Sequence, residues 1–107
     1  MAKILFEVDS RHRGALWTKL GEQASHRAKH GELAFHLHID DNARHVCYVL
    51  LEWESLASAH RFLESQASHD LVQEWPIEKV LGAIPLRDLG EEIKQWDRRH
   101  DASQETP

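Results

Sequence analysis

Apolar and polar residues alternate in two segments of the chain, 3–8 and 33–39, as they do in half-buried strands. A third segment, 46–53, is almost continuously apolar, which is typical of a central strand covered on both faces. Residues 80–86 predict a fourth strand, and Pro85 favours a sheet edge because proline has no N–H to donate to a neighbouring strand.

The segment 33–39 presents two different faces, since successive side chains of a strand point in opposite directions. The apolar face is expected to enter the core and carries Leu33, Phe35, Leu37 and Ile39. The other face carries Ala34, His36 and His38. Residues 40–42 (Asp-Asp-Asn) suit a turn, so we expect a hairpin that joins this strand to 46–53.

Two further segments repeat apolar residues every three or four positions, as amphipathic helices do. In the first, Asp9 or Ser10 is the predicted cap, Gly31 ends the helix, and the apolar positions are Leu16, Trp17, Leu20, Ala24 and Ala28. In the second, Ser55 is the predicted cap, Pro76 ends the helix, and the polar interval 65–70 predicts a break. The apolar positions of the second helix are Leu56, Ala59, Phe62, Leu63, Leu71, Val72 and Trp75.

This order of elements, βαββαβ, predicts an α+β ferredoxin-like sandwich: a four-stranded antiparallel sheet with the helices on one face. We expect one domain over residues 1–90, followed by a short C-terminal helix and a frayed tail over 91–107. The other sheet face would carry Leu5, the His36 side of the second strand and part of 46–53. That face is too apolar to be left in water, so a partner is expected to cover it.

The element order, together with WESLASAHRFL over residues 53–63 and VLGAIPL over 80–86, resembles the dimeric α/β-barrel superfamily. That superfamily includes antibiotic-biosynthesis-monooxygenase-like, muconolactone-isomerase-like and haem-degrading proteins. The resemblance covers residues 2–90. It implies a homodimer in which two sheets face each other in a barrel, with a pocket in each protomer between sheet and helices or inside the barrel. Haem-degrading members use an Asn, a Trp and a His, and the single asparagine, Asn42, lies in a predicted turn, which argues against that activity.

Charge and composition exclude several kinds of partner. The 13 Lys and Arg are scattered among 18 Asp and Glu, for a net charge of -5, so we expect no nucleic acid partner. Nine histidines make this charge sensitive to mild acid. The single cysteine, Cys47, fits a reducing compartment, and no apolar run approaches the roughly 20 residues of a membrane span. We therefore expect a cytoplasmic protein with no membrane partner.

The pair His36 and His38 is the first candidate for chemistry, since a His-x-His pair on a strand can direct two imidazoles at one metal. Two ligands do not make a site, and no metal is expected. Asp40 continues the same alternation. Either Cys47 or Tyr48 joins this face, because a change of one residue in the hairpin register exchanges them.

Glu7 lies on the same predicted sheet face as Leu5, and a carboxylate near His36 or His38 would form an acid/base pair for proton transfer. Glu7, His36 and His38 are therefore the candidate catalytic residues. Leu5 and Tyr48 are candidate ligand-binding residues. The structural alternative for Glu7 and the histidines is a buried ion pair or a hydrogen bond at a subunit interface.

His60 and His69 are two further candidates for ligand binding, because members of the superfamily often present pocket residues from the second helix. His60 lies beside the apolar stripe of this helix, where a solvated flank is the alternative. His69 lies in the polar interval, which is either a lid over the pocket or a joint between two helices.

No complete catalytic motif identifies a reaction: the chain has no Gly-rich phosphate loop, no nucleophile elbow and no paired-cysteine metal motif. We therefore expect a homodimer that binds a small, partly apolar molecule. If it is an enzyme, the resemblance implies a cofactor-independent monooxygenase or an isomerase. The alternatives are a non-catalytic dimerisation or interaction module, whose pocket is filled by its own side chains, and a metal-binding protein based on the histidines.

Overall fold

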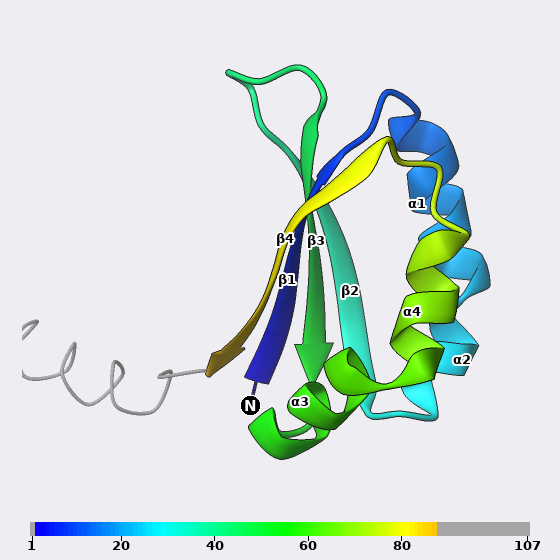
Figure 1. The fold of residues 1–107 in the computed structure, drawn as a ribbon, viewed down its shortest axis with the longest axis vertical. Helices are drawn as coiled ribbons and strands as arrows, with labels where there is room; N and C mark the ends of the chain where they lie inside the picture. Colours follow the sequence, from blue (N-terminus) through cyan, green and yellow to red (C-terminus); the bar gives the residue numbers. More distant parts are fainter. Residues whose placement is uncertain (1, 88–107) are drawn as a thin grey trace, which may run out of the picture.

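The computed structural model describes residues 2–87 and has the predicted βαββαβ order, with each helical segment divided in two (Figure 1). The predicted terminal helix and tail lie outside the described residues. The elements are β1 (Ala2–Asp9), α1 (Arg13–Glu22), α2 (Ala24–Ala28), β2 (Glu32–Ile39), β3 (Val46–Trp53), α3 (Leu56–Glu64), α4 (Gln66–Gln73) and β4 (Lys79–Arg87).

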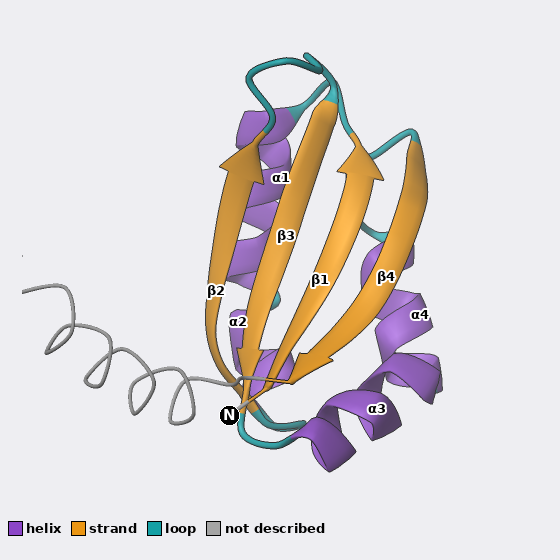
Figure 2. Cartoon of the chain, turned by 90° about the vertical axis from the view of Figure 1, so that its left-hand side faces the viewer, coloured by secondary structure: helices purple, strands orange, loops and turns teal. Residues whose placement is uncertain are grey.

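The four strands form one antiparallel sheet in the order β2-β3-β1-β4. All helices cover the same face, and the other face carries no element of residues 2–87 (Figures 1 and 2). β4 is an edge strand, as Pro85 predicted. The ferredoxin-like fold is therefore confirmed. Within residues 2–87, no helix is long and apolar enough to cross a membrane.

The core lies between the sheet and the helices. Every second residue of β1 and β3 points into it, and the helices add Leu16, Leu20, Ala59, Phe62, Leu71 and Trp75. Aromatic rings join the two layers: Phe6 meets Trp75 edge-on with ring centroids 5.0 Å apart, and Trp53 lies 4.7 Å from Phe62. These contacts fill the space between the layers with apolar side chains.

The first helical segment differs from its prediction because polar residues take the inner positions. Leu16 and Leu20 are buried as expected, but Trp17 is 51% exposed and Gln23 and Arg27 are buried in the next two turns. Gln23 accepts a hydrogen bond from Trp75 Nε1 (2.8 Å) and donates one from Nε2 to the Leu71 carbonyl (3.0 Å). These bonds, one to Leu71 on α4 and one to Trp75 just after it, satisfy the amide, which is why it can be buried.

The predicted cap of this segment is also wrong, because neither Asp9 nor Ser10 caps α1. The residue at the N-cap position is His12, which makes no capping bond with its side chain. Ser10 instead donates from its hydroxyl to the Pro76 carbonyl at 2.9 Å and accepts from the His12 N–H. Its side chain ties the start of α1 to the chain beyond α4.

The cap predicted for the second helical segment, Ser55, is confirmed, and Ser65 is a further cap at the break within the segment. Ser55 accepts from the Ser58 N–H at 3.1 Å, and Ser65 starts α4 by accepting from the Ser68 N–H at 3.2 Å. Gly31 ends the first segment with φ at 119°, a conformation that favours glycine.

A β-bulge corrects the prediction for β2. The register shifts between Glu32 and Ala34, so Glu32 lies opposite Trp53 and is buried, while Leu33 is 57% exposed. Ile39, opposite Cys47 at the end of the strand, is also exposed. The prediction that Leu33 and Ile39 are core residues is therefore wrong, whereas Phe35 and Leu37 do pack against the core.

Candidate functional site

The register of the β2–β3 hairpin decides which side chains share the open sheet face. Ile39 lies opposite Cys47, and His38 opposite Tyr48. Tyr48 therefore joins His36 and His38 on the open face. Cys47 is buried beneath the helices, and this burial raises the pKa of its thiol, which keeps it protonated and unreactive.

Two rows of side chains cross the open face, which is turned toward the viewer in Figure 2. The polar row runs from β2 to β4 through His38, Tyr48, Glu7 and Gly82. The neighbouring row is mainly apolar and contains His36, Leu50, Leu5 and Ile84. A Cβ added to Gly82 would meet nothing within 4 Å, so the space beside Glu7 is open.

Tyr48 is the hydrogen-bonded centre of the polar row. Its hydroxyl donates to Asp40 Oδ2 at 3.2 Å. This hydrogen bond to Asp40 raises the pKa of Tyr48 above its usual value, and burial and the negative charges of Asp40 and Glu7 add to the effect. The phenol is consequently protonated at neutral pH, and its one proton is directed to Asp40 in this structure.

The histidines and Glu7 share this face but do not stand on neighbouring strands. β3 separates β2 from β1, so Tyr48 lies between His38 and Glu7. The acidic neighbour of His36 is Glu52, with Nε2 and Oε2 3.8 Å apart. Within one chain the structure thus brings Glu7 next to Tyr48 rather than next to an imidazole.

The other two candidate histidines lie on the opposite side of the sheet. His60 is exposed on α3 and His69 is exposed on α4. They are therefore not brought together with the residues of the open face in one chain. Residues 2–87 contain no group of three or more His, Cys, Asp or Glu side chains that could hold a metal ion.

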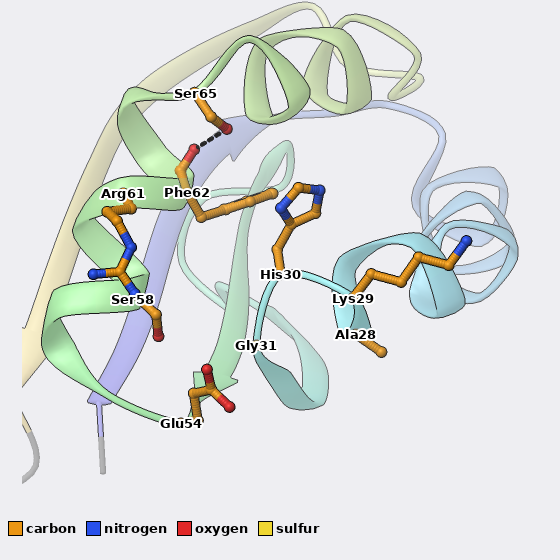
Figure 3. A pocket seen from close by; sticks show the side chains of 9 residues that line it. All are labelled: Ala28, Lys29, His30, Gly31, Glu54, Ser58, Arg61, Phe62 and Ser65. Atoms are coloured by element: carbon orange, nitrogen blue, oxygen red, sulfur yellow. Dashed lines mark hydrogen bonds between the residues drawn. The ribbon is translucent and has the colours of Figure 1, made fainter.

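A pocket of about 490 Å³, which the sequence reasoning missed, lies between the turn after α2 and the helix α3 (Figure 3). Its lining consists of Ala28, Lys29, His30, Gly31, Glu54, Ser58, Arg61, Phe62 and Ser65. The lining residues come from two segments more than 20 positions apart in the sequence. The one sign of the pocket in the sequence is Gly31, which the helix pattern explains only as the end of a helix.

Known proteins resemble this chain in structure rather than in sequence. No protein-family model matches the sequence, and no curated protein is similar to it in sequence. The crystal structure of a candidate antibiotic biosynthesis monooxygenase from Bordetella bronchiseptica matches with a TM-score of 0.67 and 8% identity, over 82% of this chain and 96% of that one.

Two further structures give the same result. A candidate antibiotic biosynthesis monooxygenase from Chloroflexus aurantiacus matches with a TM-score of 0.58 and 18% identity, over 83% of this chain and 93% of that one. One from Deinococcus radiodurans matches with a TM-score of 0.58 and 13% identity, over 82% and 92% of the two chains. The chain thus has the same fold as these structures, which confirms the expected ferredoxin-like fold and its likeness to antibiotic-biosynthesis-monooxygenase structures.

Proposed function

We propose that the protein is a homodimer that closes two open sheet faces into a barrel and binds a small, partly apolar molecule there, for proton-transfer chemistry. One observation carries the proposal: the polar row places His38, Tyr48 and Glu7 side by side on a face whose neighbouring row is apolar. Titratable groups beside an apolar surface are what general acid–base catalysis on an apolar substrate requires.

A second copy of this chain is the partner that best fits the open face. Ile84 is 52% exposed and Leu86 is also exposed, while Leu5 and Leu50 are half-buried. The apolar row lies between the polar row and a mixed row, which contains Ala34, Glu52, Lys3 and Leu86. A two-fold axis through the apolar row would therefore set apolar side chains against each other and keep the charged side chains of the flanking rows to either side.

Glu7 and Tyr48 supply complementary roles within such a barrel. Glu7 accepts a proton from a carbon next to a carbonyl or phenolic group. The protonated Tyr48 turns its hydroxyl from Asp40 and donates a hydrogen bond to the oxygen on which negative charge develops. Return of the proton at another carbon completes an isomerisation. Alternatively, O₂ converts the CH₂ to C=O, one oxygen atom enters the product, and the other leaves as water. Neither route requires a cofactor, because the substrate supplies the electrons.

The dimer is tested by light scattering at neutral pH. The wild-type protein is expected at twice the 12.4 kDa chain mass, and Ile84→Glu at the mass of one chain, because it buries a charge between the two apolar rows. Trp17→Glu is the matched control, since Trp17 is as exposed as Ile84 but lies on α1. A monomeric wild-type protein would overturn the barrel.

The chemistry is tested by incorporation of solvent deuterium into 2-tetralone and related enolisable bicyclic ketones, followed by mass spectrometry. Glu7→Gln is expected to lower the rate by about 100-fold or more, and Tyr48→Phe by about 10-fold or more. His60→Ala, on the helix side, is the control and should leave the rate unchanged. An oxygen electrode separates oxygenase from isomerase. If deuterium exchange is no faster than in buffer, or if Glu7→Gln does not change its rate, the proposed chemistry is wrong. The protein would then be a dimerisation module.

A further inference from the structure

The pocket of Figure 3 is formed within one chain and lies on the helix side of the sheet, away from the face assigned to the barrel. One wall is the turn from Ala28 to Gly31, and the other is the end of β3 with the first turns of α3. Its volume of about 490 Å³ is within the usual range for small-molecule sites, roughly 300–1,000 Å³. A ligand here would need neither the dimer nor the chemistry proposed for Glu7.

Gly31 keeps the pocket open and fixes its two walls to each other. Its φ of 119° favours glycine, and a Cβ at this position would lie 2.8 Å from Trp53 Nε1 and 3.0 Å from Glu54 Oε1. The Glu54 N–H also donates to the Gly31 carbonyl at 3.0 Å. The turn and the start of the α3 segment are thus held together before any ligand binds, and preformed walls favour binding.

The indole N–H of Trp53 is an unsatisfied polar group that lies directly behind Gly31. The indole is fully buried, and its Nε1 has no hydrogen-bond partner among residues 2–87. Buried N–H groups are normally paired, so an isolated one beside a pocket points to an acceptor that moves into place when a ligand binds. Trp53 Nε1 and Glu54 Oε1 both lie within 3.0 Å of the position that a Cβ on Gly31 would take. The Glu54 carboxylate is therefore close enough to turn and accept this bond when a ligand engages it.

The charges around the pocket favour an anion. Arg61 lines the pocket from α3, with its guanidinium beside Ser58, and His30 lines it from the turn after α2, while Lys29 extends away from the other side chains (Figure 3). Within residues 2–87, no salt bridge involves Arg61, Lys29 or Glu54, so their charges are available to a ligand. In the lining, Lys29 and Arg61 outnumber the one carboxylate, Glu54, although the net charge of the chain is -5.

Aromatic rings line the cavity between these polar groups. The His30 ring lies 5.5 Å from Phe62, and Phe62 in turn packs on Trp53. His30 and Phe62 both line the pocket. A flat ring can therefore pack against these two side chains with its polar substituents directed toward the charged ends.

We propose that this pocket binds a small hydroxylated aromatic carboxylate. The carboxylate pairs with the Arg61 guanidinium, whose fork of N–H groups matches a carboxylate in geometry. The ring packs against Phe62 and His30, and the hydroxyl donates to Glu54. The turned Glu54 carboxylate then accepts the hydrogen bond of the Trp53 indole.

The test is a titration of the full chain with 4-hydroxybenzoate, followed by NMR of the backbone and tryptophan indole N–H groups. The Trp53 indole resonance is expected to shift and saturate. Arg61→Gln should weaken binding roughly fivefold, and neutral 4-hydroxybenzamide should bind less tightly by a similar factor. Glu54→Gln should remove the preference for 4-hydroxybenzoate over benzoate. The matched control, Arg44→Gln, changes an exposed arginine in the β2–β3 turn and should have no effect.

These variants alter exposed side chains, so loss of the fold does not obscure the result. The proposal is wrong if the Trp53 indole does not shift up to about 10 mM ligand, which corresponds to a negligible binding free energy. Equal affinity of the amide and the carboxylate, or unchanged affinity in Arg61→Gln, would also overturn it. Shifts confined to the backbone around Tyr48 and His36 would move the ligand to the open face instead.

Discussion

The two faces of the sheet differ in how their side chains are kept from water. On the helix-covered face, Ile4, Val49 and Leu51 are completely buried by other parts of the same chain. On the open face, the alternating residues Leu5 and Leu50 are only half-buried, and the exposed Ile84 stands beside them on the edge strand. Both faces carry apolar side chains, yet residues 2–87 cover only one of them.

Polar groups show the same difference. On the helix side, the Arg27–Glu32 pair has side chains only 1% and 3% exposed, and Arg27 also donates from Nη2 to the Leu20 carbonyl at 2.9 Å. On the open face, the side chains of His36 and Glu52 are 48% and 34% exposed and lie 3.8 Å apart. Buried charges must find partners within the chain, whereas those of the open face remain available to a second subunit or a ligand.

The largest expected effect is a difference in the free energy of unfolding between variants that remove one member of each pair. Arg27→Met leaves the Glu32 carboxylate buried without its partner, so it should lower the free energy of unfolding by about 3–5 kcal/mol. Glu52→Gln should lower it by less than about 1 kcal/mol, because solvent screens that pair. Urea denaturation followed by tryptophan fluorescence measures both. Similar losses in the two variants would contradict the contrast.

The double variant Arg27→Met/Glu32→Leu is the control, because it removes both charges and should recover much of the loss.

Burial raises the pKa of Glu32 despite its hydrogen bond and ion pair with Arg27. Because the pKa is raised in the folded state, this carboxyl stabilises the fold at pH values below the pKa of the unfolded state. The contribution is lost as the pH rises through the pKa of the folded state. Glu32→Gln should remove that part of the pH dependence above about pH 4.5.

Two adjacent leucines of β3 compare the faces directly. Leu51 is fully buried under the helices, and Leu51→Ala should cost about 2–5 kcal/mol through lost packing and a residual cavity. Leu50 is half-buried on the open face, and Leu50→Ala should change the stability of one chain by less than about 1 kcal/mol. The same variant should weaken the proposed dimer. Thermal unfolding and light scattering measure the two effects separately, and a monomer destabilised equally by both would contradict the division.

The smallest expected effect concerns Tyr48, which is the only tyrosine in the chain. Its phenol can therefore be titrated by ultraviolet absorbance without overlap from another tyrosine. Asp40→Asn removes the main cause of the raised pKa of Tyr48, so the titration midpoint should move down toward about 10. The stability that this bond contributes is present below that value and is lost as pH rises through the folded pKa. Asp41→Asn, in the same turn, is the control and should leave the midpoint unchanged.

The elements could be predicted from sequence because each depends on a local pattern. Alternation identified the first two strands, and a continuous apolar run identified the third. Spacings of three and four residues identified the helices, and Ser55 and Gly31 marked helix ends. The prediction for the first helical segment was wrong at Trp17 for a physical reason. Apolar character alone assigned Trp17 to the core, whereas Gln23 and Arg27 are buried with partners far along the chain or on the next strand, Leu71 and Trp75 for Gln23 and Glu32 for Arg27.

The candidate site was predicted only in part. Glu7, His36, His38 and Tyr48 do share one sheet face, but their order across it depends on strand pairing, and β1 pairs with β3 rather than with β2. The pocket at Gly31 could not be predicted, because its walls, the turn after α2 and the segment 54–65, meet only when β2 pairs with β3.

The sequence by itself thus determined the fold class, since the periodicity of each segment fixes which of its sides must be buried. Tertiary structure alone decided that Tyr48 rather than Cys47 faces the open side, that a bulge turns Leu33 outward, and that Trp53 lies behind Gly31. Each of these depends on a strand register, and a shift of one residue would exchange the two faces. Packing of the whole domain selects the register, because a single register buries Val49, Leu51 and Trp53 together beneath the helices.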